Sequence, residues 1–203
     1  MKVGEQMSKI KLLDSLLKEK NGILKTSDVI KAGVSKPYFL NYVKNANLEK
    51  VAHGIYIAQN TWLDEMYLLQ LRLASSIFSH ESALYLLDLA EREPLSLTIT
   101  VKAGYNNTKL RYEGVKMYFI KPKLFELGIT ELQSPTGFTL RAYNAERTIC
   151  DLIRSRNNIE IQDVHSAIKT YTRRQEKNIP LLMRYSKEFR IERILHQYLE
   201  VLI

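Results

Sequence analysis

Hydrophobic positions in the first part of the chain recur at helical spacing in three short stretches. The first stripe ends at Asn21-Gly22, a pair typical of a helix C-terminus. A second, short helix ends at Gly33, and we expect Thr26 or Ser27 to cap its start, because a hydroxyl there can accept a hydrogen bond from a free backbone N–H. The pattern therefore predicts two helices joined to a third by a tight turn.

The third helix, predicted from a cap at Ser35 to about Asn45, has an outer face without the usual Glu and Lys. On a helical wheel, Phe39, Leu40 and Val43 form one apolar stripe. The opposite face carries two phenols and two amides: Tyr38, Asn41, Tyr42 and Asn45. Such groups can hydrogen-bond base edges or phosphates, so this face is a candidate surface for nucleic acid.

Two strand patterns, over 48–51 and 55–57, follow the third helix and flank a turn that contains Gly54, which predicts a hairpin. Helix, helix, turn, helix, hairpin is the order of a winged helix-turn-helix, whose third helix enters the major groove of DNA. We expect double-stranded DNA to contact residues at the helix starts, the third helix and the hairpin: Thr26, Ser27, Ser35, Lys36, Tyr38, Asn41, Tyr42, Asn45, Lys50 and His53. A module that docks on another protein is the alternative.

From about residue 61 the pattern predicts a larger α+β domain with a small sheet and a helical C-terminus. Alternating apolar positions predict strands over 95–101, 115–120 and 138–143. Helical spacing predicts helices over 62–75, 79–87, 145–153, 161–172, 179–185 and 189–203. The expected fold class is thus α+β, with a winged helix-turn-helix over 1–60 and an α+β domain over 61–203.

The distribution of charge along the chain supports the division into two domains but does not by itself identify a binding partner. The chain has 203 residues and a formal charge of +8. Residues 1–60 carry ten lysines, no arginine and five acidic residues, whereas residues 61–100 carry two arginines and six acidic residues. Lysines suit phosphate contacts, but the absence of arginine weakens the case for reading guanine, the base that arginine most often contacts. Any DNA binding by this segment should depend strongly on salt.

Composition also limits the chemistry. The single cysteine excludes an internal disulfide, and the four histidines lack the spacing of metal ligands, so we expect no metal and no cofactor. No stretch reaches the roughly 18 apolar residues needed to span a bilayer, and the N-terminus lacks the apolar core of a signal peptide. We therefore expect a cytoplasmic protein with no membrane partner.

Three polar groups in the second part are weak candidates for catalysis. Ser79-His80-Glu81 is expected to be a helix start, because neighbours along the chain rarely point together as a triad does. Cys150 falls among apolar helix positions and is expected in the core. Glu146 and Asp151 lack a third metal ligand, and Arg147 with Asp151 has ion-pair spacing. We expect no enzyme; the alternative is a DNA-targeted nuclease or nucleotidyl-modifying enzyme regulated by the winged helix.

The chain resembles the AbiEi-type antitoxins of bacterial abortive-infection (type IV toxin–antitoxin) systems. Three segments carry the resemblance: His53-Gly54-Ile55-Tyr56, Phe78-Ser79-His80-Glu81-Ser82-Ala83-Leu84 and Tyr143-Asn144-Ala145-Glu146-Arg147-Thr148-Ile149-Cys150-Asp151-Leu152. The size and order of the domains are also similar to those of this family.

The resemblance implies a transcriptional autorepressor that binds inverted repeats in its own promoter through the N-terminal domain. It implies that the C-terminal domain antagonises a co-encoded nucleotidyltransferase toxin without forming a stable complex with it. An inverted repeat can be filled by a symmetric dimer or by two monomers side by side. We expect a monomer or weak dimer that binds DNA cooperatively.

Overall fold

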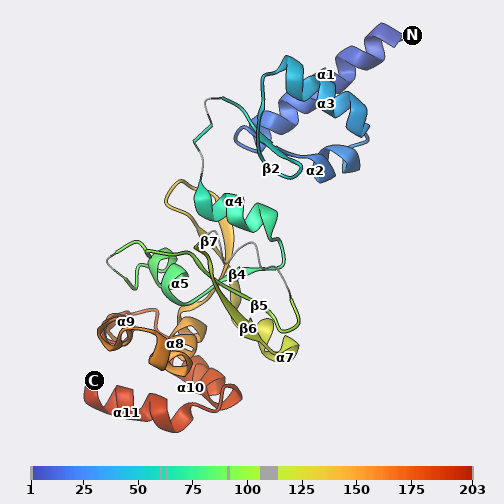
Figure 1. The fold of residues 1–203 in the computed structure, drawn as a ribbon. Helices are drawn as coiled ribbons and strands as arrows, with labels where there is room; N and C mark the ends of the chain where they lie inside the picture. The colour runs from blue at the N-terminus through green and yellow to red at the C-terminus, as the bar shows by residue number, and fades with distance from the viewer. Residues whose placement is uncertain (1, 60, 63, 91, 106–113, 203) are drawn as a thin grey trace. The chain divides into compact units, whose positions relative to one another are not determined.

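The structure, a computed structural model, describes residues 2–59, 61–62, 64–90, 92–105 and 114–202. The chain divides into two compact units, Met1–Leu63 and Asp64–Ile203 (Figure 1). Residue 60, where the sequence places the domain boundary, lies outside the described residues.

The first unit combines helices with a small antiparallel sheet. Its elements are α1 (Lys2–Glu19), β1 (Ile23–Lys25), α2 (Thr26–Lys31), α3 (Lys36–Asn45), β2 (Glu49–Ala52) and β3 (Ile55–Ile57). The strand order is β1-β3-β2, and both pairings are antiparallel. The helices and the β2–β3 hairpin follow the predicted order. Strand β1 was not predicted, because it pairs with β3, which is distant in sequence, rather than with an adjacent strand in a hairpin.

The core of this unit lies between the helices and the sheet. Leu13 of α1, Val29 of α2 and Phe39 of α3 are completely buried. The Phe39 ring meets the ring of Tyr56 edge-on, with centroids 5.4 Å apart. One aromatic pair thus joins α3 to the strand at the centre of the sheet.

The helix starts in the first unit differ from the caps predicted for them. The second helix begins at Thr26, and its N-cap residue is Lys25, so neither Thr26 nor Ser27 is the cap. Ser35 is the N-cap residue of α3, but its side chain makes no capping hydrogen bond. The hydroxyl of Ser35 is therefore not committed to the first turn of α3.

The second unit is α+β. Its elements are α4 (Glu65–Arg72), β4 (Ile77–Phe78), α5 (His80–Leu86), β5 (Thr98–Lys102), β6 (Lys116–Ile120), α7 (Pro122–Phe125), β7 (Ile129–Gln133), β8 (Thr139–Tyr143), α8 (Ala145–Arg154), the 3-10 helix η1 (Arg156–Asn158), α9 (Ile161–Arg173), α10 (Ile179–Glu188) and α11 (Glu192–Leu202). The strand order is β6-β5-β4-β8-β7. The pairs β5–β6 and β4–β8 are parallel, and the other two are antiparallel. The prediction of an α+β chain with a small sheet and a helical C-terminus is confirmed.

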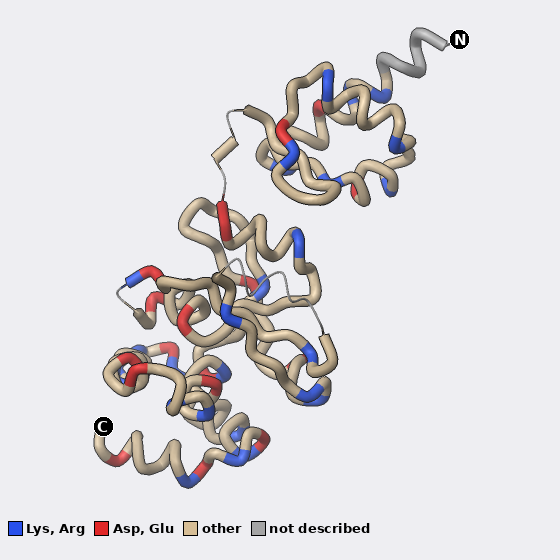
Figure 2. The backbone as a smooth tube through the Cα atoms, viewed as in Figure 1, with Lys and Arg blue, Asp and Glu red and all other residues tan. Residues whose placement is uncertain are grey.

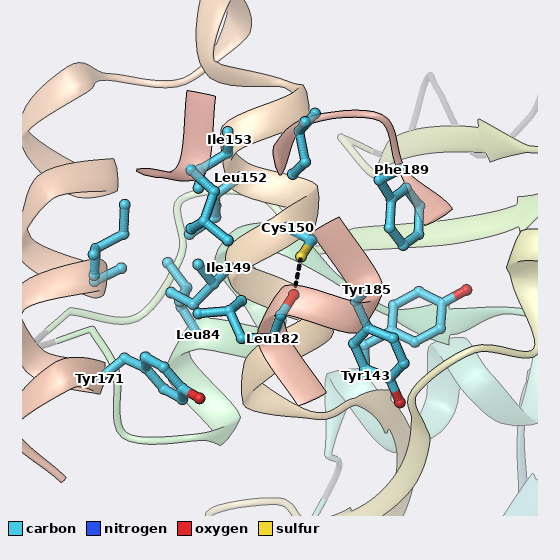
Figure 3. Packing of buried hydrophobic residues seen from close by; sticks show 14 of the residues in the cluster. Leu84, Tyr143, Ile149, Cys150, Leu152, Ile153, Tyr171, Leu182, Tyr185 and Phe189 are labelled. Carbon is cyan, nitrogen blue, oxygen red and sulfur yellow. Dashed lines mark hydrogen bonds between the residues drawn. The ribbon is translucent and has the colours of Figure 1, made fainter. Parts of the chain in front are cut away.

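Helix α8 occupies the centre of the second unit. Asn144 caps it, with its side chain accepting from the backbone N–H of Arg147 at 3.0 Å. Ile149, Leu152 and Ile153 are completely buried, and α9 and α10 pack around them (Figure 3). Because α8 is buried on every side, its polar side chains Glu146, Arg147 and Asp151 need hydrogen-bond partners within the protein.

The fourth helix is shorter than predicted. It starts at Glu65 rather than at residue 62, because the Asp64 carboxylate caps it by accepting from the backbone N–H of Tyr67 at 2.8 Å. The Ser134 and Thr136 hydroxyls bond the other oxygen of Asp64. Trp62, which was predicted to lie in this helix, precedes it and is 79% exposed.

Within the described residues, no helix has the length and apolar character that crossing a membrane requires.

Candidate nucleic-acid interface

The buried face of α3 is rotated relative to the predicted one. Phe39, Tyr42 and Val43 are buried, whereas Leu40 is only half-buried. An α-helix has 3.6 residues per turn, so a change in which face is buried exchanges neighbouring side chains between core and surface. Here Tyr42 lies in the core and Lys44 lies on the outer face. The prediction that Tyr42 belongs to the outer face is therefore wrong.

Tyr42 has a structural role instead. It is 7% exposed, and its hydroxyl donates to the Asp14 carboxylate of α1 at 2.6 Å. Burial raises the pKa of the Tyr42 phenol, and the hydrogen bond and negative charge of Asp14 raise it further. The neutral phenol thus joins α3 to α1 and is not available to a duplex.

We predict that Tyr42→Phe will lower the free energy of unfolding by about 1 kcal/mol, because it removes one hydrogen bond and keeps the packed ring. Urea unfolding would measure the change. Tyr198→Phe is a suitable control, since the Tyr198 hydroxyl has no hydrogen bond to the described residues and its ring stays against His165. Equal stabilities for Tyr42→Phe and the wild type would contradict the role assigned to the hydroxyl.

The remaining polar residues of α3 form an exposed surface. Five side chains at the start and on the outer face are exposed: Ser35, Lys36, Asn41, Lys44 and Asn45. Lys44 was missed by the sequence analysis, and a wheel centred on Phe39, Tyr42 and Val43 would have found it. Tyr38 is half-buried at the edge of this surface and packs against the core of the unit.

A groove runs along one side of this surface. It has a volume of about 520 Å³ and is lined by Ile10 of α1 and by five residues of α3: Tyr38, Asn41, Tyr42, Asn45 and Ala46. Ile10 is 45% exposed, so the wall that α1 contributes is partly apolar. Four of the predicted DNA contacts thus line one groove: Tyr38, Asn41, Asn45 and the largely buried Tyr42.

The start of α2 and the hairpin turn form a second group. The Thr26 N–H donates to the Gly54 carbonyl at 2.8 Å, so the turn that carries His53 lies against the first residue of α2. Thr26 is half-buried there, whereas Ser27, Lys50 and His53 are exposed. Ser27 makes a weak hydrogen bond to Asp28, at 3.3 Å.

The cationic side chains of the first unit are all lysines. Exposed lysines occur on α1, α2 and α3 and in the hairpin, and Figure 2 shows them spread along the chain. Ammonium groups bind phosphate oxygens as point charges, without the paired geometry by which arginine recognises guanine. On such a surface, the exposed amides Asn41 and Asn45 are the groups suited to base edges, since an amide can bond adenine at two atoms.

The second unit contains a buried histidine that does contact its neighbour in sequence. The Nδ1 atom of His80 lies 3.0 Å from the Ser79 Oγ, and Nε2 lies 3.1 Å from the Ser155 Oγ. The ring stacks on Tyr118, with centroids 3.5 Å apart. Burial lowers the pKa of His80, and the charges of Arg147, Arg154 and Lys116 lower it further.

The third member of the sequence triplet does not join this group. The Glu81 carboxylate pairs with Lys116 at 2.9 Å. The Ser79 hydroxyl also accepts from Thr100 at 2.8 Å, so it belongs to a network between α5 and β5. Ser79-His80-Glu81 is a helix start, as expected, with Ser79 as the N-cap residue of α5. The side chains of Ser79 and His80 do meet, contrary to expectation, yet the contacts describe a neutral, packed histidine rather than a base oriented by a carboxylate.

Glu146 and Asp151 are likewise used within the protein. One Glu146 oxygen accepts from the Tyr171 hydroxyl at 3.0 Å and from the Asn178 N–H at 3.2 Å. Asp151 accepts from Arg147 Nε at 3.0 Å, the i,i+4 pair that the sequence suggested. Among the described residues, no group of three His, Cys, Asp or Glu side chains could hold a metal ion.

Cys150 is a core residue, as predicted. It is completely buried, and burial raises the pKa of its thiol, which the Asp151 charge raises further. Its Sγ contacts the Leu182 carbonyl of α10 at 3.9 Å (Figure 3). A thiol held neutral in an apolar environment is a poor nucleophile.

Comparison with known proteins defines the fold only. No protein-family model and no curated protein matches the sequence. Among solved structures, the chain is similar to the crystal structure of the RV2827C protein from Mycobacterium tuberculosis, with a TM-score of 0.56 and 13% sequence identity. The similarity covers 90% of this chain and 71% of that one. At 13% identity the similarity shows a shared fold alone.

Proposed function

We propose that this protein is a DNA-binding autorepressor whose first unit acts as a winged helix-turn-helix. The observation that carries the proposal is the exposed surface of α3, where two amides and two lysines lie opposite the buried side chains of Phe39, Tyr42 and Val43. The order of helices and strands and the hairpin against the start of α2 support it.

In this proposal α3 enters the major groove. Asn41 and Asn45 contact base edges, and Lys36 and Lys44 contact the flanking phosphates. Ser35, whose hydroxyl makes no capping bond, stands at the N-terminus of α3, where helix dipole and backbone N–H groups favour a phosphate. Ser27, Lys50 and His53 contact the backbone beside the groove.

We further propose, from the resemblance to AbiEi-type antitoxins, that the second unit antagonises a co-encoded nucleotidyltransferase toxin. In this proposal Arg147, Asp151 and Glu146 of α8 have a structural role, since each bonds another residue of the second unit. Growth of cells that co-express the neighbouring nucleotidyltransferase with or without this chain tests the proposal. Equal toxicity in both cases would contradict it.

The DNA-binding proposal is tested by Asn41→Ala combined with Asn45→Ala. We expect this variant to bind the chain's own promoter at least ten-fold more weakly, because each amide contact to a base contributes about 1–3 kcal/mol. Stability should be kept, since both side chains are exposed and alanine favours helix. Gel-shift titration with the promoter and with a scrambled duplex measures affinity and selectivity.

Two further variants test whether the loss of promoter affinity is specific to the α3 amides. Asn157→Ala with Asn158→Ala removes two exposed amides from the second unit and should leave promoter affinity unchanged. Lys36→Ala should weaken binding to promoter and scrambled DNA alike and reduce the slope of log affinity against log salt by about one. The proposal fails if the Asn41→Ala, Asn45→Ala variant binds the promoter as the wild type does.

A further inference from the structure

The second unit has a cationic cleft that the DNA-binding surface does not include. Its volume is about 500 Å³. Three segments line it: the corner between β6 and α7, the end of α8, and the turn between α10 and α11. The lining residues are Ile120, Lys121, Lys123, Leu124, Arg154, Lys187, Glu188, Phe189 and Arg190.

Charge in the cleft is strongly unbalanced. Five of its lining side chains are cationic and one, Glu188, is anionic. Within the described part of the chain, Lys187 has an ion pair, with Glu192 at 3.5 Å, and both side chains are well exposed. The other four cations have no ion pair to the described residues. The cationic side chains from these three segments repel one another in the folded protein. A bound anion would reduce this electrostatic repulsion.

Another cation lies directly behind the wall of this cleft. The Arg147 guanidinium is completely buried, 4.5 Å from the centre of the Phe189 ring, and donates to the Leu124 carbonyl at 2.8 Å. Its Nη2 atom is buried and has no hydrogen-bond partner among the residues that the structure describes. Leu124 and Phe189 both line the cleft, so the Arg147 guanidinium, which carries this Nη2 donor, contacts two residues of the cleft wall.

The backbone at Arg190 is left-handed. Arg190 closes the end of α10 with φ of 57°, a left-handed conformation that glycine normally supplies at this position. Its N–H donates to the Lys187 carbonyl at 3.0 Å, which fixes the turn. Asn47 and Asp88 have the same conformation after α3 and α5, so it marks a helix end rather than a ligand. What matters for the cleft is that the residue in this turn is an arginine whose side chain lines it.

We infer that this cleft binds a small oligophosphate, the chemistry that a nucleoside triphosphate and inorganic triphosphate share. The volume falls within the range of about 300–1,000 Å³ that small-molecule sites occupy. Lysine and arginine side chains that converge from three sides suit a compact anion with several charged oxygens. The backbone of a duplex is convex and spreads its phosphates along a line, so it matches a concave, convergent site poorly.

The test is isothermal titration calorimetry of the full chain with inorganic triphosphate and, separately, with ATP. We expect saturable binding of both, at one site per chain. Tighter binding of ATP would identify a nucleotide as the ligand, and equal binding would identify a site that recognises phosphates alone. The variant is Arg190→Gly with Lys121→Ala, since glycine keeps the left-handed turn and removes the guanidinium. It should weaken binding at least ten-fold without loss of stability.

A matched control separates a site from general charge. Lys169→Ala with Arg173→Ala removes two exposed cations from α9 of the same unit and should change affinity by less than about two-fold. The inference is wrong if the wild type shows no saturable binding at millimolar triphosphate, or if the two double variants lose affinity equally. Displacement of triphosphate by a duplex of scrambled sequence would also overturn it, in favour of a nucleic-acid surface.

Discussion

Arg147→Met is expected to destabilise the second unit by about 3–5 kcal/mol, because it leaves the Asp151 carboxylate buried without its partner. Both side chains are almost completely buried, and Nε lies 3.0 Å from the carboxylate. The guanidinium also donates to the Leu124 and Leu127 carbonyls, at 2.8 and 2.7 Å, and lies 3.8 Å from the centre of the Tyr143 ring. The loss thus reaches α7, β8 and α8 together. Urea unfolding followed by circular dichroism measures the change.

A second variant distinguishes an uncompensated charge from lost packing. Arg147→Met with Asp151→Leu removes both charges and should recover part of the loss, since apolar side chains often replace a buried ion pair at little cost. Lys169→Ala, an exposed change on α9, should leave stability unchanged. A double variant no more stable than Arg147→Met alone would show that the hydrogen bonds to the two carbonyls, rather than the ion pair, hold this part of the unit together.

Gly128→Ala is expected to cost about 2–5 kcal/mol, from a strained backbone and from overlap with neighbouring atoms. Gly128 has φ of 78°, a left-handed conformation. A Cβ atom there would lie 2.7 Å from the Cβ of Arg147 and 2.9 Å from the Asn144 Oδ1, which accepts the capping hydrogen bond of α8. Thermal unfolding of the variant tests this expectation.

Gly137→Ala is the matched control for that prediction. Gly137 has φ of 87°, but a Cβ atom there would meet nothing within 4 Å. This control should cost only the conformational part, about 1–2 kcal/mol. If both variants lose the same stability, the close approach of Gly128 to α8 is not what fixes glycine at that position.

Much of the fold follows from the sequence because local patterns are strong in it. The helical spacing around Leu13, the alternation over β5 and β6, and the Asn144 cap all act within a few residues, so a linear pattern records them. Strands β1, β4 and β7 were not predicted. Strands β1 and β4 are only three and two residues long and pair with strands distant in sequence, β3 for β1 and both β5 and β8 for β4. Strand β7 forms a hairpin with the next strand, β8, and was missed although its partner is close in sequence.

The candidate interface was predicted in part for the same reason. Asn41 and Asn45 are exposed on α3, as the wheel placed them. Tyr42 was misplaced because a phenol is compatible with either face, and the choice depended on Asp14, 28 residues away, which accepts its hydroxyl proton in a hydrogen bond. Lys44 was missed by the same error in the orientation of the helix.

The sequence by itself determined the α+β class, the order of helices and hairpin in the first unit and the lysine-rich charge of that unit, because these depend on spacing and composition. Only the tertiary structure decided which face of α3 is buried, why Arg147 and Asp151 belong to the interior, and that Lys121, Arg154 and Arg190 line one cleft. Those properties depend on contacts between segments far apart in the chain, and burial then makes each unpaired charge or misplaced side chain costly.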